Sequence, residues 1–226
     1  MKLSVIVPVF NEKNTIEMLI EKLIAVPIDK EIIIVDDGST DGTTRILKKI
    51  SEQNPGLIKV IFQPRNMGKG YAIRKAIGQV TGDVVIIQDA DLEYEPMDYL
   101  RMIEPIKQGR ADVVYGSRIL GKNPVSSFSF YVGGRFLSLL TNILYGTSIT
   151  DEPTCYKMFK SDILKSVKLN CKRFEFCPEI TARIAKKKIK IYEVPIRYSP
   201  RRIKEGKKIR WKDGIIAVWT LIKYRF

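Results

Sequence analysis

The sequence predicts an α/β fold in which helices flank a mostly parallel β-sheet, followed by C-terminal amphipathic helices. Two observations lead to this fold class. Short runs of apolar, often β-branched residues alternate with helical apolar stripes over the first half of the chain. The short runs are apolar on both faces, which is typical of strands buried in a parallel sheet. The 226 residues, 45% of them hydrophobic and 28% charged, form an ordinary globular composition.

Strands and helices are expected to alternate through the first half of the chain. Leu3–Val9 is a short β-branched run, and the apolar residues of Thr15–Ala25 recur at the spacing of one helix face. Right-handed connections through such helices place successive strands parallel to one another. The further strands expected are Glu31–Val35, Lys59–Phe62, Asp83–Gln88 and Ala111–Tyr115, and the further helices are Thr43–Ile50, Tyr71–Val80 and Met97–Lys107.

The pattern changes after residue 120. The segment from Ser126 to Ile149 is apolar and aromatic, with almost no charge. No internal repeat or low-complexity linker divides the chain. Beyond residue 150 we expect a strand at Cys155–Phe159, a helix at Pro178–Lys187, a strand at Ile189–Tyr198, a basic loop at Arg201–Lys212 and an amphipathic helix at Asp213–Tyr224.

Composition narrows the possible functions before any motif is considered. Lys and Arg number 39 against 25 Asp and Glu, and the net charge of +14 favours an anionic partner: phosphates, an acidic membrane surface or nucleic acid. The absence of histidine excludes a His general base, a Ser-His-Asp triad and a His metal ligand. Three cysteines without a Cys-x-x-Cys pair indicate packed thiols in a reducing cytosol. No uncharged run approaches the ~20 residues that a membrane span needs.

Polar side chains follow the expected strands at the end where α/β sheets bind their ligands. Asp36 and Asp37 follow the second strand, Asp89 and Asp91 the fourth, and Arg118 the fifth. A role in capping the next helix fits Asp36 and Asp89 poorly, because each of them ends a strand. These strand ends are therefore where chemistry is expected.

Asp89-Ala90-Asp91 places two carboxylates two residues apart after a very apolar strand. Hard oxygen ligands with no His or Cys nearby select Mg²⁺ or Mn²⁺, and Glu93 could add a third oxygen. Such an ion prefers few protein ligands together with substrate oxygens, so a diphosphate-bearing substrate is expected. The alternative is a loop in which these carboxylates only cap backbone groups.

Two common nucleotide-binding motifs are absent from the chain, and the remaining polar segments are weak signals for nucleotide binding. The chain has neither the GxGxxG dinucleotide fingerprint nor the GxxxxGK[ST] phosphate loop. The acidic turn at Asp36 and Asp37 could accept a base N–H or ribose hydroxyls, but it would repel phosphate. Lys69, in a Gly-Lys-Gly segment before a helix, could lie near a base or phosphate or could simply belong to a helix entry.

Together, four ordered motifs resemble glycosyltransferase family 2. They run from Val7 to Glu12, Asp36 to Thr43, Asn66 to Gly70, and Gln88 to Glu93. Within that family the chain is most similar to dolichol-phosphate mannose or glucose synthases and to prokaryotic polyprenyl-phosphate hexosyltransferases, from residue 3 to about residue 200. The resemblance implies the Rossmann-like GT-A fold, with a catalytic domain over residues 1–200 and a basic loop with an amphipathic helix over 201–226.

The resemblance also implies a donor, a metal and their residues. The donor would be a nucleotide-diphosphate sugar of the GDP-mannose or UDP-glucose type, used with Mg²⁺ or Mn²⁺ and with inversion at the anomeric carbon. Asp89, Asp91 and Glu93 would hold the metal, and Arg201 or Arg202, from a basic loop that closes over the donor in the relatives, would clamp the leaving phosphates. The residues expected around the nucleotide sugar are Pro8, Phe10, Glu12, Asp36, Asp37, Lys69, Asp89, Ala90, Arg201 and Arg202.

The acceptor is expected on the other side of the site. Arg135, Ser138 and Asn142 share one face of an otherwise apolar helix, which suits a phosphate head group on a long prenyl tail. The resembling synthases carry acceptor-phosphate arginines in this region, which implies that role for Arg118, Arg135 and Ser138. The catalytic residues expected are then Asp91, Arg118 and Arg135. The alternative is a core helix with one snorkelling arginine.

Two other functions stay open from the sequence. A hydroxyl acceptor on a glycan or other soluble molecule would require a general base, and the candidates are Asp151, Glu152, Glu175 and Glu179. The ED-x-x-W type of base motif found in many hydroxyl-glycosylating relatives is not visible, which favours a phosphate acceptor. A basic nucleic-acid-binding domain rests on the net charge alone and is not expected.

The C-terminal segment fits either an interfacial amphipathic helix or a helix docked on the domain. Apolar residues such as Ile215 and Trp219 are flanked by Lys212, Lys223 and Arg225. Basic residues near an anionic lipid surface contribute about 1 kcal/mol each. We therefore expect a cytoplasmic protein attached peripherally to the anionic membrane surface.

Overall fold

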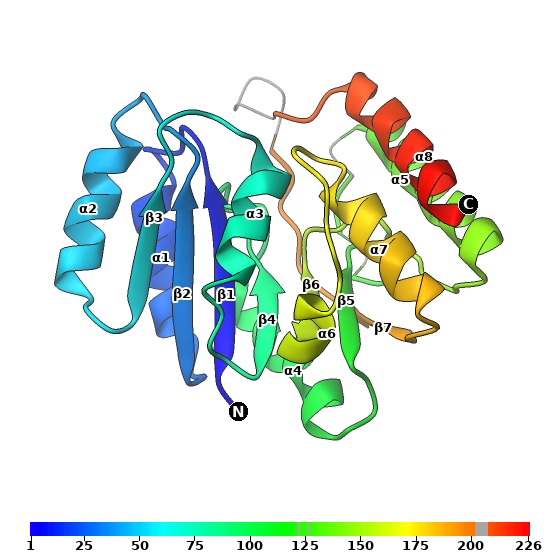
Figure 1. Ribbon diagram of the computed structural model, residues 1–226, viewed down its shortest axis with the longest axis horizontal. Helices are drawn as coiled ribbons and strands as arrows, with labels where there is room; N and C mark the ends of the chain where they lie inside the picture. Colours follow the sequence, from blue (N-terminus) through cyan, green and yellow to red (C-terminus); the bar gives the residue numbers. More distant parts are fainter. Residues whose placement is uncertain (122, 126, 202–207) are drawn as a thin grey trace.

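The computed structural model describes residues 1–121, 123–125, 127–201 and 208–226, and its centre is a seven-stranded sheet with helices on both faces (Figure 1). The elements, in chain order, are β1 (Leu3–Val9), α1 (Ile16–Ala25), β2 (Lys30–Asp36), α2 (Thr43–Gln53), β3 (Ile58–Phe62), α3 (Lys69–Ile77), β4 (Val84–Ile87), η1 (Pro96–Asp98), α4 (Tyr99–Lys107), β5 (Val113–Ser117), α5 (Phe128–Tyr145), β6 (Lys157–Lys160), α6 (Ser161–Lys165), α7 (Phe176–Lys186), β7 (Ile191–Pro195) and α8 (Trp211–Arg225).

The strands lie in the order β3-β2-β1-β4-β6-β5-β7. β6 runs antiparallel to β4 and β5, and the other strand pairs are parallel. The expected mostly parallel sheet is therefore confirmed. The direction of β6 was not expected, because hydrophobic periodicity reports which faces are buried and not which way a strand runs.

The register aligns the strand ends that carry the polar motifs. β1 pairs with β2 so that Val9 lies opposite Asp36, and with β4 so that Ile6 lies opposite Ile87. The segments that follow these strands therefore leave the sheet at one common edge. Parallel α/β sheets bind ligands at this edge, because successive loops diverge there and leave a crevice.

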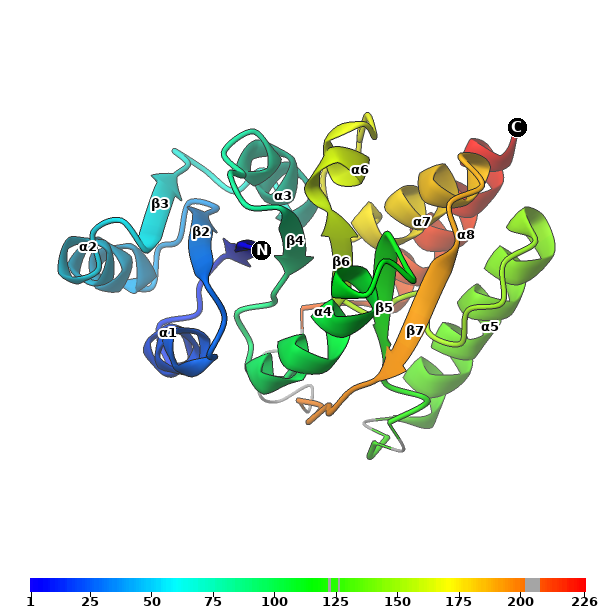
Figure 2. The same cartoon turned by 90° about the horizontal axis from the view of Figure 1, so that it is seen from below.

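Helices cover both faces of the sheet, with α1 and α4 on one side and α3, α6 and α7 on the other (Figure 2). The apolar stripe predicted for the first helix is buried through Ile16, Leu19, Ile20 and Leu23. These side chains join the central strands in one continuous core. Burial of this kind contributes about 25 cal/mol for each Å² of apolar surface, so it dominates the stability of the sheet half.

The helices α5, α7 and α8 form a separate layer beside the C-terminal strands (Figure 1). Leu137 of α5 packs against Ala217 and Leu221 of α8 in a small second core. The helix α5 lies inside the apolar segment noted in the sequence and ends at Gly146, whose φ of 66° is the left-handed conformation that glycine adopts without steric cost. Within the described residues, none of the helices combines the length and apolarity that crossing a bilayer requires.

Element boundaries differ from the expectations in informative places. The helix α3 begins at Lys69, inside the Gly-Lys-Gly segment, and α8 begins at Trp211, inside the expected basic loop. The short helix α6 was not expected, since five residues carry too little periodicity to be recognised. The predicted strand at Cys155–Phe159 is shifted to Lys157–Lys160, where it pairs with β4 and β5.

Candidate active site

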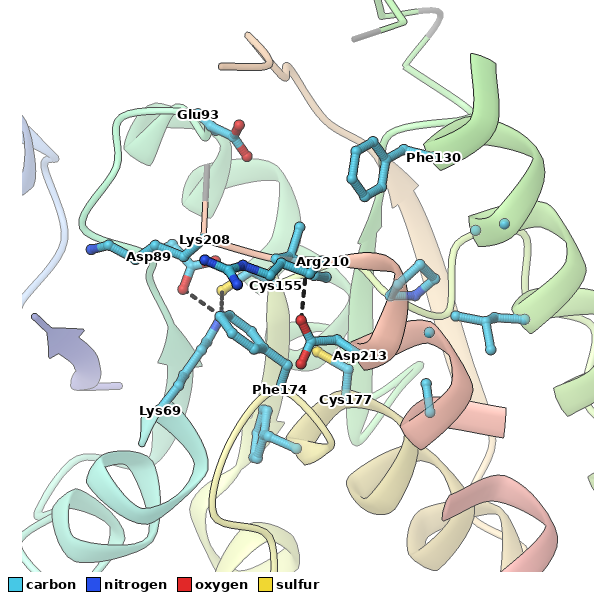
Figure 3. A pocket seen from close by; sticks show the side chains of 18 of the residues that line it. Lys69, Asp89, Glu93, Phe130, Cys155, Phe174, Cys177, Lys208, Arg210 and Asp213 are labelled. Atoms are coloured by element: carbon cyan, nitrogen blue, oxygen red, sulfur yellow. Dashed lines mark hydrogen bonds and ion pairs between the residues drawn. The ribbon is translucent and has the colours of Figure 1, made fainter. Parts of the chain in front are cut away.

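A cavity of about 1220 Å³ opens at the carboxyl edge of the sheet and extends between α5 and α8. Its wall combines the strand-end loops with the helical layer, as Figure 3 shows for part of it. Arg202 lies outside the described residues, and neither Asp36 nor Ser138 lines the cavity. The expected site residues that line it are Pro8, Phe10, Glu12, Asp37, Lys69, Asp89, Ala90, Asp91, Glu93, Arg118, Arg135 and Arg201.

The two neighbouring aspartates after β2 do different things. The carboxylate of Asp37 accepts the backbone N–H groups of Met67 at 2.7 Å and Gly68 at 2.8 Å, which ties this loop to the entry of α3. Burial raises the pKa of Asp37 against the effect of these hydrogen bonds. Asp36 accepts the N–H of Ser39 at 3.0 Å and is turned into its own loop. Asp37 reaches the cavity wall and Asp36 does not, so the role of Asp36 beside a nucleoside stays a prediction.

Glu12 forms the meeting point of the first strand end and the C-terminal segment. Its carboxylate lies 3.1 Å from the guanidinium of Arg201 and 2.7 Å from Nζ of Lys208. Lys208 also donates to the backbone carbonyl of Phe10, and Nε of Arg201 donates to the backbone carbonyl of Asp91 at 2.6 Å. Arg201 and Lys208, which flank the segment 202–207 in the sequence, therefore place two cations beside the part of the cavity formed by the strand-end loops.

The carboxylates of the Asp-x-Asp motif lie close to another carboxylate, and their negative charges are only partly compensated by nearby cations. Oδ1 of Asp89 lies 2.5 Å from Nζ of Lys69 (Figure 3). Burial alone would lower the pKa of Lys69, but the charge and hydrogen bond of Asp89, together with the nearby Cys155 and Cys177, outweigh burial and raise it. Asp91 is buried next to Asp89 and Glu93. Burial first, and then the two neighbouring negative charges, raise the pKa of Asp91 to about 7. This group of acids therefore favours an additional cation.

The residues present fit a divalent cation of the hard type. Asp89 and Asp91 offer carboxylate oxygens and no nitrogen, which is the ligand chemistry of Mg²⁺ and Mn²⁺. Glu93 lines the same cavity, and its carboxylate accepts the hydroxyl of Tyr198 at 2.7 Å and the backbone N–H of Arg201 at 2.7 Å. No group of three His, Cys, Asp or Glu side chains in the described part of the chain is arranged to hold a metal. Two aspartates together with substrate oxygens would be the holding set.

Arg118 is held by a buried aspartate in the part of the cavity wall that follows β5. Nε and a terminal nitrogen of Arg118 donate to the two oxygens of Asp151 at 2.8 and 2.7 Å, and the backbone N–H of Arg118 adds a third bond at 2.8 Å. The guanidinium lies 5.1 Å from the ring centroid of Tyr198. Burial would raise the pKa of Asp151, but Arg118 outweighs burial and holds it below its usual value. The paired geometry fixes the orientation of this cation at the cavity wall.

Arg135 and Ser138 are close to the same loop but differ in exposure. Arg135 is exposed and donates to the backbone carbonyl of Thr150 at 3.1 Å. Ser138 is buried, accepts the N–H of Glu152 at 2.9 Å and donates to the carbonyl of Gly134. The alternative of a core helix with a snorkelling arginine does not hold, because the outer face of α5 is exposed to solvent along with Arg135.

Of the four candidate general bases, three are engaged elsewhere. Asp151 is bonded to Arg118, as above. Glu175 accepts the backbone N–H groups of Lys172 and Arg173. Glu179 accepts two backbone N–H groups, pairs with Arg183 at 2.8 Å and does not line the cavity.

Glu152, the fourth candidate, lines the cavity but is fully buried, and burial raises its pKa. Its Oε1 is 3.3 Å from the Thr181 hydroxyl, and Oε2 is the buried side-chain polar atom without a hydrogen-bond partner among the described residues. The ammonium of Lys157 donates to the Glu152 backbone carbonyl at 2.6 Å and does not donate to the carboxylate.

Several wall residues were not identified from the sequence. Cys155 and Cys177 lie in the wall near Lys69, with Cys155 Sγ 3.7 Å from Nζ of Lys69 (Figure 3). Burial raises the pKa of both thiols, so they are packing groups rather than reactive ones. Arg210 and Asp213 also line the cavity, at the first turn of α8. In the sequence, Arg210 belongs to the basic loop Arg201–Lys212 and Asp213 to the amphipathic helix that follows it, and neither pattern predicts a place in the cavity wall.

A mostly parallel sheet, with paired aspartates after β4 and Arg118 and Arg135 in the wall of the same cavity, is the arrangement that the comparisons with known proteins address. The model of the family described as "Glycosyl transferase family 2" matches residues 4–168, so this chain belongs to that family. The expected GT-A-like architecture is confirmed by solved structures. Glucosyl-3-phosphoglycerate synthase from Mycobacterium tuberculosis, in complex with Mn²⁺, UDP-glucose and phosphoglyceric acid, has a TM-score of 0.73 and covers 99% of this chain and 79% of its own. At 19% sequence identity, this likeness concerns the fold.

Curated relatives match over most of this chain. A dolichol-phosphate mannosyltransferase from Pyrococcus furiosus is 31% identical over 216 residues, covering 92% of this chain and 59% of the relative. An undecaprenyl-phosphate 4-deoxy-4-formamido-L-arabinose transferase from Edwardsiella ictaluri is 29% identical over 209 residues, covering 90% and 62%. A low-salt glycan biosynthesis hexosyltransferase from Haloferax volcanii is 29% identical, covering 88% and 48%. The chain thus spans about half to three fifths of the length of these relatives.

Proposed function

We propose that this chain transfers a hexose from a nucleotide-diphosphate sugar, of the GDP-mannose or UDP-glucose type, to a polyprenyl or dolichyl phosphate. The transfer would depend on Mg²⁺ or Mn²⁺ and would invert the anomeric carbon. The family membership and the names of the relatives, a dolichol-phosphate mannosyltransferase and undecaprenyl-phosphate sugar transferases, support this choice.

The observation that carries the proposal is the contrast between cations and bases on the acceptor side. Arg118 and Arg135 line the cavity there, whereas three of the four candidate bases are engaged and the fourth, Glu152, is buried. A phosphate acceptor needs no base, because it is already an oxyanion at neutral pH. It needs cations that bind it and orient one oxygen towards the anomeric carbon.

The reaction exchanges one carbon–oxygen bond for another. An oxygen of the lipid phosphate would form a bond to the anomeric carbon as the bond from that carbon to the nucleoside diphosphate breaks, from the opposite face. The divalent ion would neutralise charge on the leaving diphosphate. Asp89 and Asp91 would hold that ion, and Arg201 and Lys208 would exchange Glu12 for the donor phosphates.

The surface of the helical layer supports attachment to a lipid surface. Phe136, Leu139 and Ile143 of α5 are exposed, as are Trp211 and Trp219 of α8. Contiguous exposed apolar side chains beside basic ones are typical of helices that lie in a membrane interface. Peripheral attachment at the cytoplasmic, anionic membrane face would bring the cavity between α5 and α8 to the head groups of the lipid acceptor.

The direct test is a transfer assay with matched acceptors. The chain, with Mn²⁺ and a panel of labelled nucleotide sugars, is incubated with farnesyl phosphate or with farnesol, which has the same tail and no phosphate. Label is expected in a hexosyl-phosphoryl lipid with inverted anomeric configuration, and none in a farnesol glycoside. Transfer to farnesol or to a soluble hydroxyl, with none to farnesyl phosphate, would contradict the proposal.

A hydroxyl acceptor is the second candidate, and one observation favours it. Asp213 lines the cavity at the first turn of α8, where its carboxylate accepts the backbone N–H of Arg210 at 2.7 Å. A carboxylate in this position could act as a base towards a soluble acceptor. If the acceptor is a hydroxyl and Asp213 is its base, Asp213→Asn should abolish transfer and spare donor binding. If the acceptor is a phosphate, transfer should continue in the same variant.

A further inference from the structure

One loop contacts all three residues expected to bind the acceptor phosphate. Within residues 150–154, Asp151 binds the guanidinium of Arg118, the carbonyl of Thr150 accepts from Arg135, and the N–H of Glu152 donates to Ser138. These partners come from the end of β5 and from α5. The position of this loop therefore determines how the acceptor cations lie relative to one another.

The loop is itself held by a carboxylate from the edge strand β7. Glu193 accepts the backbone N–H of Thr150 at 2.7 Å through Oε2 and that of Asp151 at 3.1 Å through Oε1. Glu193 is in parallel register with Tyr115, two residues before β5 ends at Ser117. The backbone that carries Asp151 and the strand that leads to Arg118 are thus fixed from one position.

Glu193 occupies a place that disfavours a charged carboxylate. Burial raises its pKa, and the neighbouring carboxylate of Asp151 adds to the increase, while the N–H groups of Thr150 and Asp151 oppose it. A neutral side chain would avoid that penalty, but it could not accept from two adjacent N–H groups with both of its terminal atoms.

We propose that Glu193 is a positioning residue for the acceptor: it holds Thr150 and Asp151, and through Asp151 it orients Arg118 towards the acceptor phosphate. This inference rests on the proposed function. Glu193 does not line the cavity, so it acts through other residues and is not a catalytic group.

The test compares Glu193→Gln with a matched control, Glu31→Gln. Glu31 also accepts two backbone N–H groups, those of Thr81 at 2.7 Å and Gly82 at 3.1 Å, and it does not line the cavity. For Glu193→Gln we expect the KM for farnesyl phosphate to rise about tenfold, with donor affinity within about twofold of wild type. Glu31→Gln is expected to lower the melting temperature but to leave the acceptor KM unchanged. An equal rise in both variants, or a matching loss of donor affinity, would overturn the inference.

A double-mutant cycle with Arg118→Lys separates positioning from general destabilisation. Lysine keeps a cation beside Asp151 but cannot make the two-pronged contact. If Glu193 acts through Arg118, adding Glu193→Gln to Arg118→Lys should raise the acceptor KM less than about twofold further, whereas full additivity would contradict the mechanism.

Two further outcomes are decisive. If Glu193→Gln does not fold, Glu193→Asp, which withdraws the carboxylate by one methylene, must show the same rise in acceptor KM; an unchanged KM overturns the inference. If the wild type transfers sugar to farnesyl phosphate and Glu193→Gln has an unchanged acceptor KM, only the positioning role of Glu193 is contradicted. Wild-type transfer to a hydroxyl alone removes the proposed function, and the acceptor role of Glu193 with it.

Discussion

The strand-end loops on the donor side and the helical layer on the acceptor side build their parts of the cavity in different ways. On the donor side, Asp89 and Asp91 follow one strand directly and lie two residues apart. On the acceptor side, Arg118 is bonded to Asp151, 33 residues away, and Thr150 is bonded to Glu193, 43 residues away. Carboxylates adjacent in sequence define the first wall, and long-range hydrogen bonds define the second.

This difference extends to packing. The donor side stands on the main core, whose central strands are completely buried. The α5–α8 pair shares a small core of Leu137, Ala217 and Leu221 and leaves much apolar surface exposed. The donor side should therefore tolerate loss of a site carboxylate without unfolding, whereas the acceptor side should couple function to stability.

The largest effect is expected on the donor side. Asp91→Ala should lower transfer by about 10²–10³-fold, because stabilisation of the leaving diphosphate is lost. It should also abolish the Mn²⁺-dependent shift in melting temperature caused by a nucleotide sugar. Asp112→Ala, which removes an exposed carboxylate paired with Lys160, is the charge control and should leave both properties intact. Full Mn²⁺-dependent donor binding by Asp91→Ala would contradict the metal assignment.

On the acceptor side, Arg118→Ala should lower stability as well as transfer. It leaves the buried carboxylate of Asp151 without its cation, which costs about 3–5 kcal/mol in comparable buried pairs. Arg197→Ala is the matched control: Asp98 is also buried, but the Arg197 side chain is 63% exposed, so solvent screening limits the loss to about 1 kcal/mol. Urea denaturation of both variants measures the contrast, and equal losses would show that the Arg118 pair is not special.

Arg135→Ala separates acceptor binding from stability on the same side. Arg135 is exposed, and its guanidinium donates a hydrogen bond to the carbonyl of Thr150. We expect the KM for farnesyl phosphate to rise about tenfold, the amount that a charged hydrogen bond of 1.4 kcal/mol supplies, with an unchanged melting temperature. Unfolding of this variant would mean that the helix needs the arginine for structure.

The exposed aromatic residues of α8 should control attachment to lipid. Replacing Trp219, which is 63% exposed and does not line the cavity, by alanine should weaken binding to vesicles containing anionic phospholipid by about tenfold. Flotation of the protein with such vesicles measures this. Transfer to short-chain, water-soluble farnesyl phosphate should not change. Phe62→Ala, an exposed aromatic on β3 far from this layer, is the control and should bind vesicles like the wild type.

The smallest effect is expected from Glu152→Gln. Because burial raises the pKa of Glu152, its ionised form destabilises the folded state at neutral pH. The isosteric amide should therefore raise the free energy of unfolding at pH 7 by about 1 kcal/mol. The advantage should shrink as the pH falls through the raised pKa and vanish below about 4.3, where the unfolded carboxyl is protonated as well. Urea denaturation from pH 4 to 8 measures the trend.

The same variant bears on the acceptor. Transfer to farnesyl phosphate should continue in Glu152→Gln, because no base is needed. If Glu152→Gln is stable but inactive towards every acceptor while it still binds donor, Glu152 is the general base and the hydroxyl alternative is right.

The sequence by itself determined the α/β class, the alternation of elements and the residues at the strand ends. These follow from periodicity and from motif residues adjacent in the chain, which need no knowledge of long-range contacts. It also directed attention to Arg118 and Arg135 through a family resemblance. It did not show that Asp36 turns into its own loop or that Glu93 accepts hydrogen bonds from Tyr198 and Arg201, because the direction in which a side chain points after a strand depends on its neighbours in space.

Only the tertiary structure decided the direction of β6, the partner of Arg118 and the exposure of the outer face of α5. It also brought Arg210 and Asp213 of α8 into the cavity wall and attached the loop at Asp151 to Glu193. Each of these depends on contacts between segments far apart in the chain, and hydrophobic periodicity records whether a side chain is buried but not which residue buries it.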